Sequence, residues 1–453
     1  MMFEKKHDDT IDFIQQGMEQ LKTSSPKSLS ITSSICDDNY HMIYMKQDVY
    51  YDKYYGIMNI PQVLSQIIEH PLFQRLKHVA QLGPMKYKYT FAGYSRDEHS
   101  IGVAHLAKKV SDVLKEKYPE ISYRELLCLQ IAALAHDLGH GPFSHSFDHL
   151  LKKHGFKSRT KSHEVRSQKI IEYIIHDLQN KNTLPIELTD NDIHLIQYFI
   201  DPKEFKLGIG MSKRQSNDVK VYPDFLEELF THGLEDIVNN ISCRLDIDKM
   251  DYLIRDARVL ETGRAINVDP INSIHEILVN SCIIEARWVF NIYTKANIEG
   301  LIMIRSLLHT TGYNSIGMNA IECMLTDALL SANDILNFTA CCSLADEKDF
   351  DQFCQMTDDY IINAILRSDD SRLDKATDLI CRIMKQENLY HLKTSTVVKP
   401  NTTDQDVSVI SVPLFTDKSS ISKMIEIIPY CNNGEILGKR GSETLYRIYG
   451  KNN

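Results

Sequence analysis

Apolar residues recur at helical spacing along most of the chain, in long stretches separated by short polar breaks. This periodicity predicts amphipathic or buried α-helices. The clearest stretch covers residues 121–138, where Ser122 and Glu125 form a capping-box start and the residues that follow are apolar on nearly every side. Further helices are expected at about 99–118, 243–260, 298–313 and 319–336.

Strand signals are few and mostly late in the chain. They are TSTVVKP (394–400), VSVISVPLF (407–415) and MIEIIPYCNNGEIL (424–437), and the last resembles a β-hairpin with Asn-Asn-Gly between apolar runs. Residues 1–44 are rich in Ser and Thr and are expected to form a flexible lead-in. The pattern predicts a mainly α-helical fold, with a helical domain at 45–393 and a small mixed α+β C-terminal subdomain at 394–453.

Composition narrows the class of protein. The 453 residues, 43% hydrophobic and 25% charged, are typical of a globular protein with more than one subdomain. A net charge of −10 argues against a sequence-independent grip on nucleic acid. The ten cysteines include no C-x-x-C pair, which favours a reducing intracellular compartment, cytoplasmic or nuclear. No window has the length and apolarity of a membrane span, and the charged N-terminus does not resemble a signal peptide.

The segment HDLGHGPFSHSFDH (136–149) concentrates four histidines and two aspartates around a Gly-Pro break. His136 and Asp137 end the predicted buried helix. Because adjacent helical side chains point about 100° apart, both reach one ion only if it lies near the helix end. His99 and Asp248 are candidates for the remaining ligands. Imidazoles with carboxylates suit Mn, Fe or Zn, with Mg less favoured, and open coordination positions indicate a hydrolytic metal.

Two polar stripes on otherwise apolar helices support a pocket. Asp248, Tyr252 and Asp256 share the spacing i, i+4, i+8, and the same spacing recurs in Arg305, His309 and Tyr313. Each of these residues taken singly also fits a simpler interpretation, as a residue of a polar loop, a surface charge or a core aromatic. Their joint order favours the walls of a pocket.

Five segments taken together resemble the HD-domain deoxynucleoside triphosphate (dNTP) triphosphohydrolase family. They are FQRLKHVAQLG (73–83), SRDEHSIG (95–102), HDLGHGPFSHSFD (136–148), KSHE (161–164) and DIDKMDYLIRD (246–256). The similarity spans about residues 45–393 and is greatest to the branch that carries a SAM domain before its HD domain. It implies an HD-superfamily helical domain and, in this chain, no SAM domain within the 44-residue lead-in.

The resemblance also implies roles for individual residues. It makes His99, His136, Asp137 and Asp248 the metal ligands. His145, oriented by Asp148, corresponds to the proton donor for the leaving 5′ oxygen. The residues near the phosphates are His140, His163, Arg96, Lys249 and Arg305. The residues around the deoxyribose are Gln81, Leu82, Tyr252, Asp256 and Tyr313, with His309 and Asn314 at other positions of the pocket.

The activity implied is hydrolysis of dNTPs to deoxynucleoside and inorganic triphosphate, by attack of metal-bound water on the α-phosphorus. One divalent ion at the HD site and additional Mg²⁺ with the triphosphate are expected, in a homo-oligomer that is a dimer or a tetramer. Two alternatives stay open. One is an HD phosphohydrolase acting on nucleoside monophosphates or other phosphate esters, and the other is a non-catalytic nucleotide-binding regulator.

The chain departs from the family pattern at positions that hold an activating guanine nucleotide there. The guanine-recognising Asp and Arg correspond to Glu69 and Lys77, and a His-Lys pair corresponds to Ser315 and Ile316. Lys cannot reproduce the two parallel hydrogen bonds of Arg. We therefore expect an enzyme that works without GTP or uses another effector. The shorter C-terminal segment argues against a tetramer.

Overall fold

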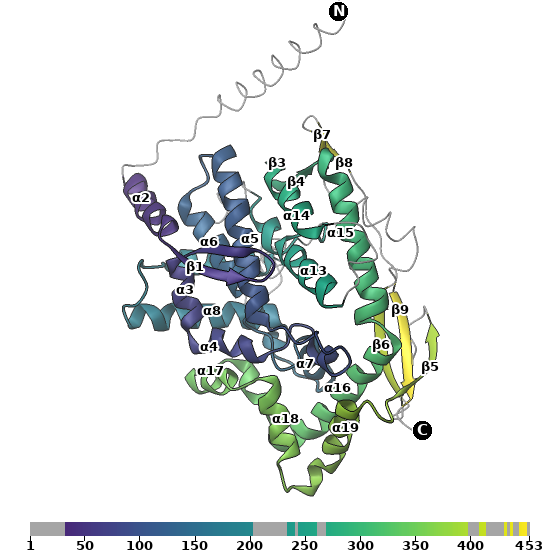
Figure 1. Cartoon of the computed structure of the whole chain (residues 1–453). Helices are drawn as coiled ribbons and strands as arrows, with labels where there is room; N and C mark the ends of the chain where they lie inside the picture. Colours follow the sequence, from purple (N-terminus) through teal and green to yellow (C-terminus); the bar gives the residue numbers. More distant parts are fainter. Residues whose placement is uncertain are drawn as a thin grey trace, which may run out of the picture.

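The computed structural model describes residues 32–202, 233–240, 243–260 and 269–396, together with four later strands at 407–413, 430–432, 435–437 and 444–450. The described part is mainly helical, as the periodicity predicts (Figure 1). Its α-helices are α2 (Thr32–Met45), α3 (Gln62–Glu69), α4 (Pro71–Gln74), α5 (Arg96–Lys117), α6 (Tyr123–Ala135), α7 (His145–Lys153), α8 (His163–Asn180), α9 (Asp190–Ile200), α12 (Glu235–Val238), α13 (Ile247–Val259), α14 (Pro270–Val279), α15 (Lys295–Leu307), α16 (Ile316–Leu336), α17 (Glu347–Cys354), α18 (Asp358–Leu366) and α19 (Asp374–Lys385).

Short single-turn segments connect several of these helices. They are the 3₁₀ helices η1 (Arg75–His78), η2 (Gly83–Tyr87), η3 (Arg159–Lys161), η5 (Ile292–Thr294), η7 (Ala340–Ser343) and η8 (Ser371–Leu373), and the π-helix η6 (Leu308–Tyr313). The π-helix falls inside the stretch predicted as one helix at 298–313. It continues α15 directly and precedes α16, so the predicted helix changes its hydrogen-bonding pattern halfway along.

Nine strands form three small sheets in the described part of the chain. They are β1 (Gln47–Asp52), β2 (Gly56–Pro61), β3 (Ser281–Ile284), β4 (Arg287–Asn291), β5 (His391–Thr396), β6 (Val407–Pro413), β7 (Tyr430–Asn432), β8 (Glu435–Leu437) and β9 (Thr444–Gly450). The predicted hairpin is confirmed, because Asn432 pairs with Glu435 across β7 and β8. β7 also pairs in parallel with β4, so one C-terminal strand joins a sheet begun much earlier in the sequence.

Two sequence expectations near the N-terminus are wrong. Helix α2 occupies residues 32–45, inside the segment expected to be a flexible lead-in, and it buries Tyr40 and Tyr44. Those tyrosines reach across to Asp192 and Asp112, contacts that no local pattern contains. Strands β1 and β2 form an antiparallel hairpin where helical structure was expected. Residues 1–31 lie outside the described residues.

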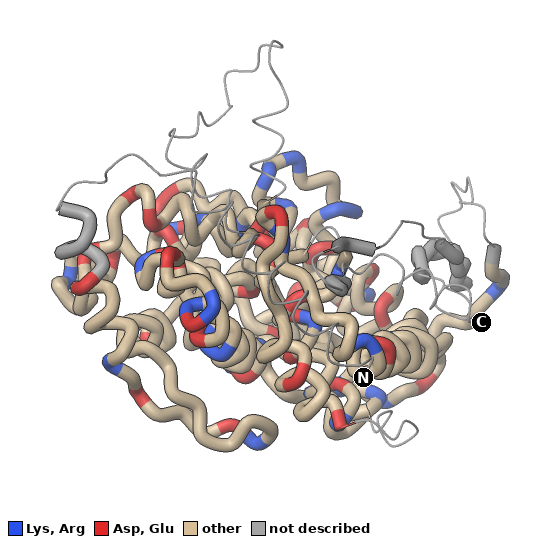
Figure 2. The backbone as a smooth tube through the Cα atoms, turned by 90° about the horizontal axis from the view of Figure 1, so that it is seen from above, with Lys and Arg blue, Asp and Glu red and all other residues tan. Residues whose placement is uncertain are grey.

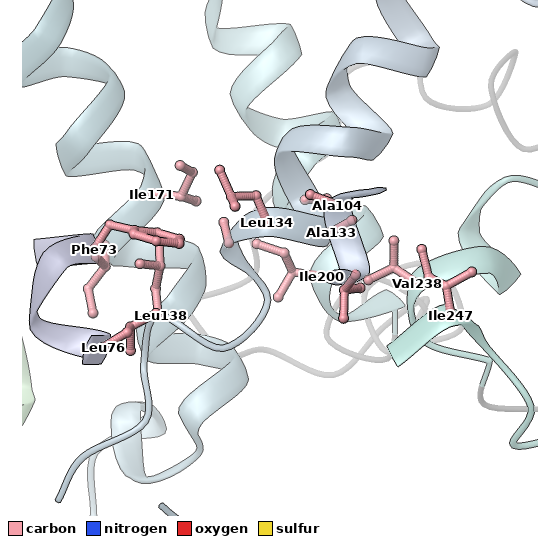
Figure 3. Close-up of a cluster of buried hydrophobic side chains, with 14 of the residues drawn as sticks. Phe73, Leu76, Ala104, Ala133, Leu134, Leu138, Ile171, Ile200, Val238 and Ile247 are labelled. Atoms are coloured by element: carbon pink, nitrogen blue, oxygen red, sulfur yellow. The ribbon is translucent and has the colours of Figure 1, made fainter. Parts of the chain in front are cut away.

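Helix α6 is apolar on nearly every side because neighbouring helices bury it. The predicted capping box is present, since the Ser122 side chain accepts from the Glu125 backbone N–H and the Glu125 carboxylate accepts from Ser122. Every residue from Glu125 to Ala135 is buried, with α5 and α9 packed on the helix. Figure 3 shows Leu134 of α6 among buried side chains from neighbouring helices, including Phe73, Ile171 and Ile200. Burial of each such side chain contributes roughly 1.5–3 kcal/mol.

The charges of the described backbone positions are mixed in sign. Figure 2 shows basic and acidic positions interspersed along the tube rather than gathered into one area of that view. Among the described residues, no helix is both long enough and apolar enough to cross a membrane. The eight cysteines that the structure describes are all free.

Candidate active site

Four candidate ligands from three helices converge on one point. His99 lies in the first turn of α5, His136 caps the C-terminus of α6, and Asp248 lies in the first turn of α13. Donor atoms of these three residues all lie within 4.8 Å of one another. Asp137 adds a carboxylate whose oxygens lie 3.5 Å from Nε2 of His99 and 3.5 Å from Nε2 of His136. Two donors bound to one ion at about 2.1 Å would lie roughly 3–3.5 Å apart.

Each histidine is turned so that Nε2 faces this point. Nδ1 of His99 is 2.7 Å from the Asp251 carboxylate, and Nδ1 of His136 is 2.8 Å from the Ala133 carbonyl. Protonation of both Nδ1 atoms satisfies these acceptors and leaves the Nε2 lone pairs free, which is the arrangement of metal-binding histidines. Nε2 of His136 is buried and has no hydrogen-bond partner among the described residues. The donor set therefore fits a divalent ion such as Mn, Fe or Zn.

Asp137 is held in its charged form by Arg96. Burial alone would raise the pKa of Asp137, but the charges of Arg96 and His136 hold it well below its usual range. The Arg96 guanidinium bonds the Asp137 carboxylate and also donates through Nε to Ser144 Oγ at 2.8 Å. Ser144 has a positive φ of 58° and donates to the Ala80 carbonyl at 2.6 Å. The turn before α7 thus adopts a strained conformation that positions the site's arginine.

Buried arginines fix the turn that follows His136. Arg75 donates through Nη2 to the carbonyls of Leu138 and His140 at 2.7 Å each. Arg166 donates through Nε to the carbonyl of Gly139 at 2.6 Å. A Cβ on Gly139 would lie only 2.1 Å from the backbone oxygen of His163, so a glycine is required where the turn meets α8. The turn from Leu138 to His140 is therefore fixed on several sides by buried groups.

His140, His145 and His163 form an aromatic cluster beside the ligand group. The rings of His140 and His163 stack at 3.9 Å, and His145 meets them edge-on at 4.9 Å and 5.6 Å. Burial and the charge of Arg96 lower the pKa of His140 well below its usual range. Burial would also lower the pKa of His163, but Glu164 and Asp148 raise it. The pKa values of the two stacked rings are therefore shifted in opposite directions.

Asp148 does not orient His145 as the resemblance implies. Its carboxylate accepts from Nδ1 of His163 at 2.7 Å and from Nη2 of Arg166 at 2.6 Å. His163 and Arg166 both come from α8, so the Asp148 carboxylate points from its own helix, α7, toward α8. The donor atoms of His140, His145, Asp148 and His163 also lie within 4.8 Å of one another. Because Asp148 is already paired with a guanidinium, this group suits proton handling better than a second metal.

A second region of the site surrounds Asp256, two helical turns beyond Asp248 on α13. Tyr94 donates to one oxygen of Asp256 at 2.5 Å, and Tyr313 donates to the other. Burial raises the pKa of Asp256 to about 6 despite these hydrogen bonds. Tyr252 lies between Asp248 and Asp256 in the predicted stripe and is half-buried. Tyr313, the last residue of the π-helix η6, therefore lies beside Asp256 of the stripe on α13.

The other predicted residues of this region lie before η2 and in or directly after the π-helix η6. Gln81 and Leu82 precede η2, and Oε1 of Gln81 is buried without a hydrogen-bond partner among the described residues. His309 contacts Tyr313 edge-on at 5.0 Å, and its Nδ1 lies 3.3 Å from the side-chain nitrogen of Asn314. Burial and the charge of Arg305 lower the pKa of His309 to about 3.

Lys249 and Arg305 share a hollow between α13 and α15. Its lining residues are Cys243, Arg244, Leu245, Lys249, Leu253, Leu301, Ile302 and Arg305. Lys249 is paired through Nζ with Asp246 at 2.6 Å, and Arg305 donates to the Arg244 carbonyl at 3.3 Å. The cationic side chains of Arg244, Lys249 and Arg305 therefore line one hollow.

Several residues of the site were missed at the sequence level. Asp251 is the partner of His99 and lies one turn after Asp248, within the DIDKMDYLIRD segment. Arg166 holds both Gly139 and Asp148, and Arg244 adds a cation to the hollow. The spacing of Asp251 from Asp248 was visible in the sequence. The pairing of Asp251 with His99 was not, because 152 residues separate them.

Comparison with known proteins agrees with this geometry. The HD domain pattern matches residues 96–255, a range that contains all four candidate ligands. The mouse deoxynucleoside triphosphate triphosphohydrolase SAMHD1 is 31% identical over 362 residues, covering 76% of this chain and 53% of that protein. The bovine protein of the same name is 32% identical over 361 residues, covering 75% and 57%. The Dictyostelium discoideum SAMHD1 homolog is 30% identical over 349 residues, covering 77% and 60%.

The chain spans somewhat more than half the length of these curated relatives. The similarity nevertheless extends well beyond the ligand-bearing helices, over about three quarters of the chain. The chain therefore contains an HD domain, and its predicted resemblance to the HD-domain dNTP triphosphohydrolases is confirmed.

Proposed function

We propose that this protein is a metal-dependent dNTP triphosphohydrolase, which splits a dNTP into deoxynucleoside and inorganic triphosphate. The observation that carries the proposal is the convergence of two oriented histidine Nε2 atoms with two carboxylates, next to a cluster of cations and histidines. A divalent ion held by His99, His136, Asp137 and Asp248 would act as a Lewis acid toward a phosphoryl oxygen and lower the pKa of a water ligand.

The chain's own residues would bind the triphosphate by charge. Arg96 is already fixed by Asp137 and Ser144, so it offers its guanidinium to a phosphate without further ordering. Lys249 and Arg305 line the hollow beside α13, and Arg244 lies with them. The three cations around this hollow support recognition of a polyphosphate rather than a single phosphate group.

His145 would supply the proton that the departing 5′ oxygen needs. Although solvent reaches His145, the protein around it and the charges of Arg96 and His163 lower its pKa. A bound triphosphate would add negative charge close to these groups and favour protonation of His145. His163, paired with Asp148, would hold a proton next to it, and His140 would contact the α-phosphate as a neutral ring.

Asp256, Tyr252 and Tyr313 would receive the deoxyribose. Asp256 already accepts hydrogen bonds from two tyrosines, and one of these can be exchanged for a sugar 3′-hydroxyl. Gln81 has an unpartnered buried carbonyl oxygen and Leu82 an apolar face, and both would bound the same sugar. Tyr313 would crowd the space of a 2′-hydroxyl and so favour deoxynucleotides over ribonucleotides.

The test is incubation of the purified chain with each dNTP and NTP, with Mn²⁺ or Mg²⁺, while released triphosphate, orthophosphate and nucleoside are measured. We expect deoxynucleoside and triphosphate in equal amounts. Asp137→Ala should lower turnover by more than the ~10–100-fold typical of an outer-shell change, and should lose bound metal as well. Triphosphate from no dNTP under any condition would contradict the proposal. Orthophosphate from nucleoside monophosphates would favour the other class of HD phosphohydrolase.

A further inference from the structure

A buried chain of ion pairs connects the turn of the β1–β2 hairpin to His99. Asp52, the last residue of β1, accepts from Nη1 of Arg255 at 2.9 Å. Arg255 donates through Nε to Asp251 at 2.7 Å, and the same Asp251 oxygen is 2.7 Å from Nδ1 of His99. We propose that Asp52 is a positioning residue, which sets the orientation and basicity of His99 through Arg255 and Asp251. The inference rests on the metal centre of the proposed function.

The hairpin turn holds Asp52 in place from the other side. Its second carboxylate oxygen accepts from the backbone N–H of Tyr54 at 2.7 Å and of Tyr55 at 3.0 Å. Tyr55 in turn donates through its hydroxyl to Asp251 at 2.8 Å. The turn therefore reaches Asp251 twice, directly through Tyr55 and indirectly through Arg255. A shift of the turn would move both contacts together.

Close contact between α5 and α13 leaves the side chains of these ion pairs little room to move. Asp251 and Arg255 are fully buried, and Asp52 is 8% exposed. A Cβ on Gly102 would lie 2.1 Å from the Asp251 carboxylate and 2.3 Å from Nη2 of Arg255. Gly102 lies on α5 one turn after His99, so the missing side chain lets the ion pair sit directly against the ligand's own helix.

The charges of these ion pairs determine how Asp52 affects His99. Arg255 carries one positive charge between the two carboxylates of Asp52 and Asp251, so one negative charge stays uncompensated beside His99. A carboxylate that accepts from Nδ1–H raises the electron density at Nε2 and strengthens the metal bond. Without Asp52, Arg255 would draw on Asp251 alone, and Asp251 would accept from His99 less strongly. Metal affinity should then fall, although Asp52 touches neither the ion nor its ligands.

The experiment measures Mn²⁺ binding to the metal-free full chain by calorimetry, without nucleotide. Asp251→Asn should raise the Kd by about 10–100-fold, as expected for a direct partner of a metal-binding histidine. Asp52→Asn, which keeps the shape of the turn, should raise the Kd by at least about threefold, less than Asp251→Asn. The double variant should bind no more weakly than Asp251→Asn alone, because both changes act through one hydrogen bond.

A matched control separates positioning from general loss of stability. Arg124 lies in the first turn of α6 and pairs with the buried Asp192 of α9. Arg124 is about 18 Å along α6 from His136. Arg124→Gln should lower the Tm while leaving the Mn²⁺ Kd within about twofold of wild type. If Asp52→Asn does not fold, Arg255→Lys replaces it, since Lys keeps the charge but cannot bridge two carboxylates.

Unchanged Mn²⁺ affinity in Asp52→Asn, or in Arg255→Lys where that variant replaces it, would overturn the inference. Losses that multiply in the double variant would overturn it as well, because they would show that Asp52 acts by a route other than Asp251. The proposed function can fail separately. A chain that binds Mn²⁺ with the predicted pattern but releases no triphosphate from any dNTP would contradict the proposed activity and support the positioning role.

Discussion

Two buried carboxylates of the site have pKa values shifted in opposite directions because their donors differ. Asp137 is paired with the guanidinium of Arg96, and its pKa lies well below its usual range. Within the described part of the chain, Asp256 accepts hydrogen bonds from the neutral hydroxyls of Tyr94 and Tyr313, and burial raises its pKa to about 6. A full positive charge offsets the cost of burying a carboxylate, whereas two hydroxyls do not. Asp137 therefore keeps its negative charge to a lower pH than Asp256 does.

This difference predicts a pH-dependent cost at Asp256. Between its ordinary pKa of 3.8 and about 6 the folded chain binds the proton more tightly than the unfolded chain does. The free energy of unfolding therefore decreases as the pH rises through that range, and above pH 6 the full cost of roughly 3 kcal/mol is present. Asp256→Asn removes this cost. The free energy of unfolding of the variant, relative to that of wild type, should therefore rise by about 1 kcal/mol or more from pH 5 to pH 8.

Urea unfolding of both proteins at several pH values measures this difference. A difference between Asp256→Asn and wild type that stays constant from pH 5 to pH 8 would contradict the raised pKa. The same variant should bind dNTPs more weakly, because the asparagine no longer accepts two hydrogen bonds. Higher stability together with a higher KM would mark Asp256 as a residue kept for binding at a cost to stability.

At the scale of elements, the apolar periodicity of the sequence predicted the helices that local interactions determine. Helices α5, α6, α13 and α16 lie within a few residues of their expected ranges, because each has a long apolar period. Helix α2 was missed, since its two buried tyrosines find partners far away in the sequence. Hairpin β1–β2 was missed although Gly56 stands within a short Asp52–Gly56 turn, a signal that was available.

The same division holds within the site. The four candidate metal ligands were named from the sequence, because the HD motif lies at a helix end that the periodicity places and the family resemblance adds His99 and Asp248. Their partners could not be predicted, since a buried ion pair is specified only when two helices are packed together. Asp148 shows this clearly: the family resemblance implied that it orients His145, but Arg166 and His163 from α8 pair with its carboxylate.

Helix α18 contributes one residue that joins two loops of the site. The buried Asp358 accepts from the backbone N–H of Phe143 at 2.7 Å and of Ala80 at 3.2 Å, and it pairs with Lys86 at 2.9 Å. Asp358→Ala leaves these donors unsatisfied, so the free energy of unfolding should fall by about 2–4 kcal/mol. The KM for dATP should also rise, because the residues beside Gln81 and Ser144 lose their common anchor. Urea unfolding and steady-state kinetics measure the two effects.

Asp359 provides the matched control for that change. It is the next residue of the same helix, in the same first turn, and it is exposed. Asp359→Ala should cost less than about 1 kcal/mol, the value of a charge near a helix N-terminus, and should leave the KM unchanged. Equal effects of the two substitutions would show that α18 needs only a negative charge at its start.

At the scale of the whole molecule, the proposed catalytic residues and the departures from the family pattern lie in different environments. His99, His136 and Asp137 are buried between helices. Glu69 and Lys77 are exposed at the end of α3 and in η1, and Ile316 is 53% exposed at the start of α16. The surface positions can therefore change without disturbing the helices that carry the candidate metal ligands. We therefore expect changes at these surface positions to alter a response to an effector without altering the candidate metal site.

This separation predicts dNTP hydrolysis that does not depend on GTP. The rate of triphosphate release from dATP should change by less than about twofold as GTP is added, because Lys77 cannot make the paired hydrogen bonds of an arginine and Ile316 offers no side-chain donor. A steep rise with GTP would contradict this. A combined variant carrying Glu69→Asp, Lys77→Arg, Ser315→His and Ile316→Lys provides the converse test. If these four positions account for the difference, the variant should respond to GTP while its metal affinity stays that of wild type, since none of the four contacts a candidate ligand in the described structure.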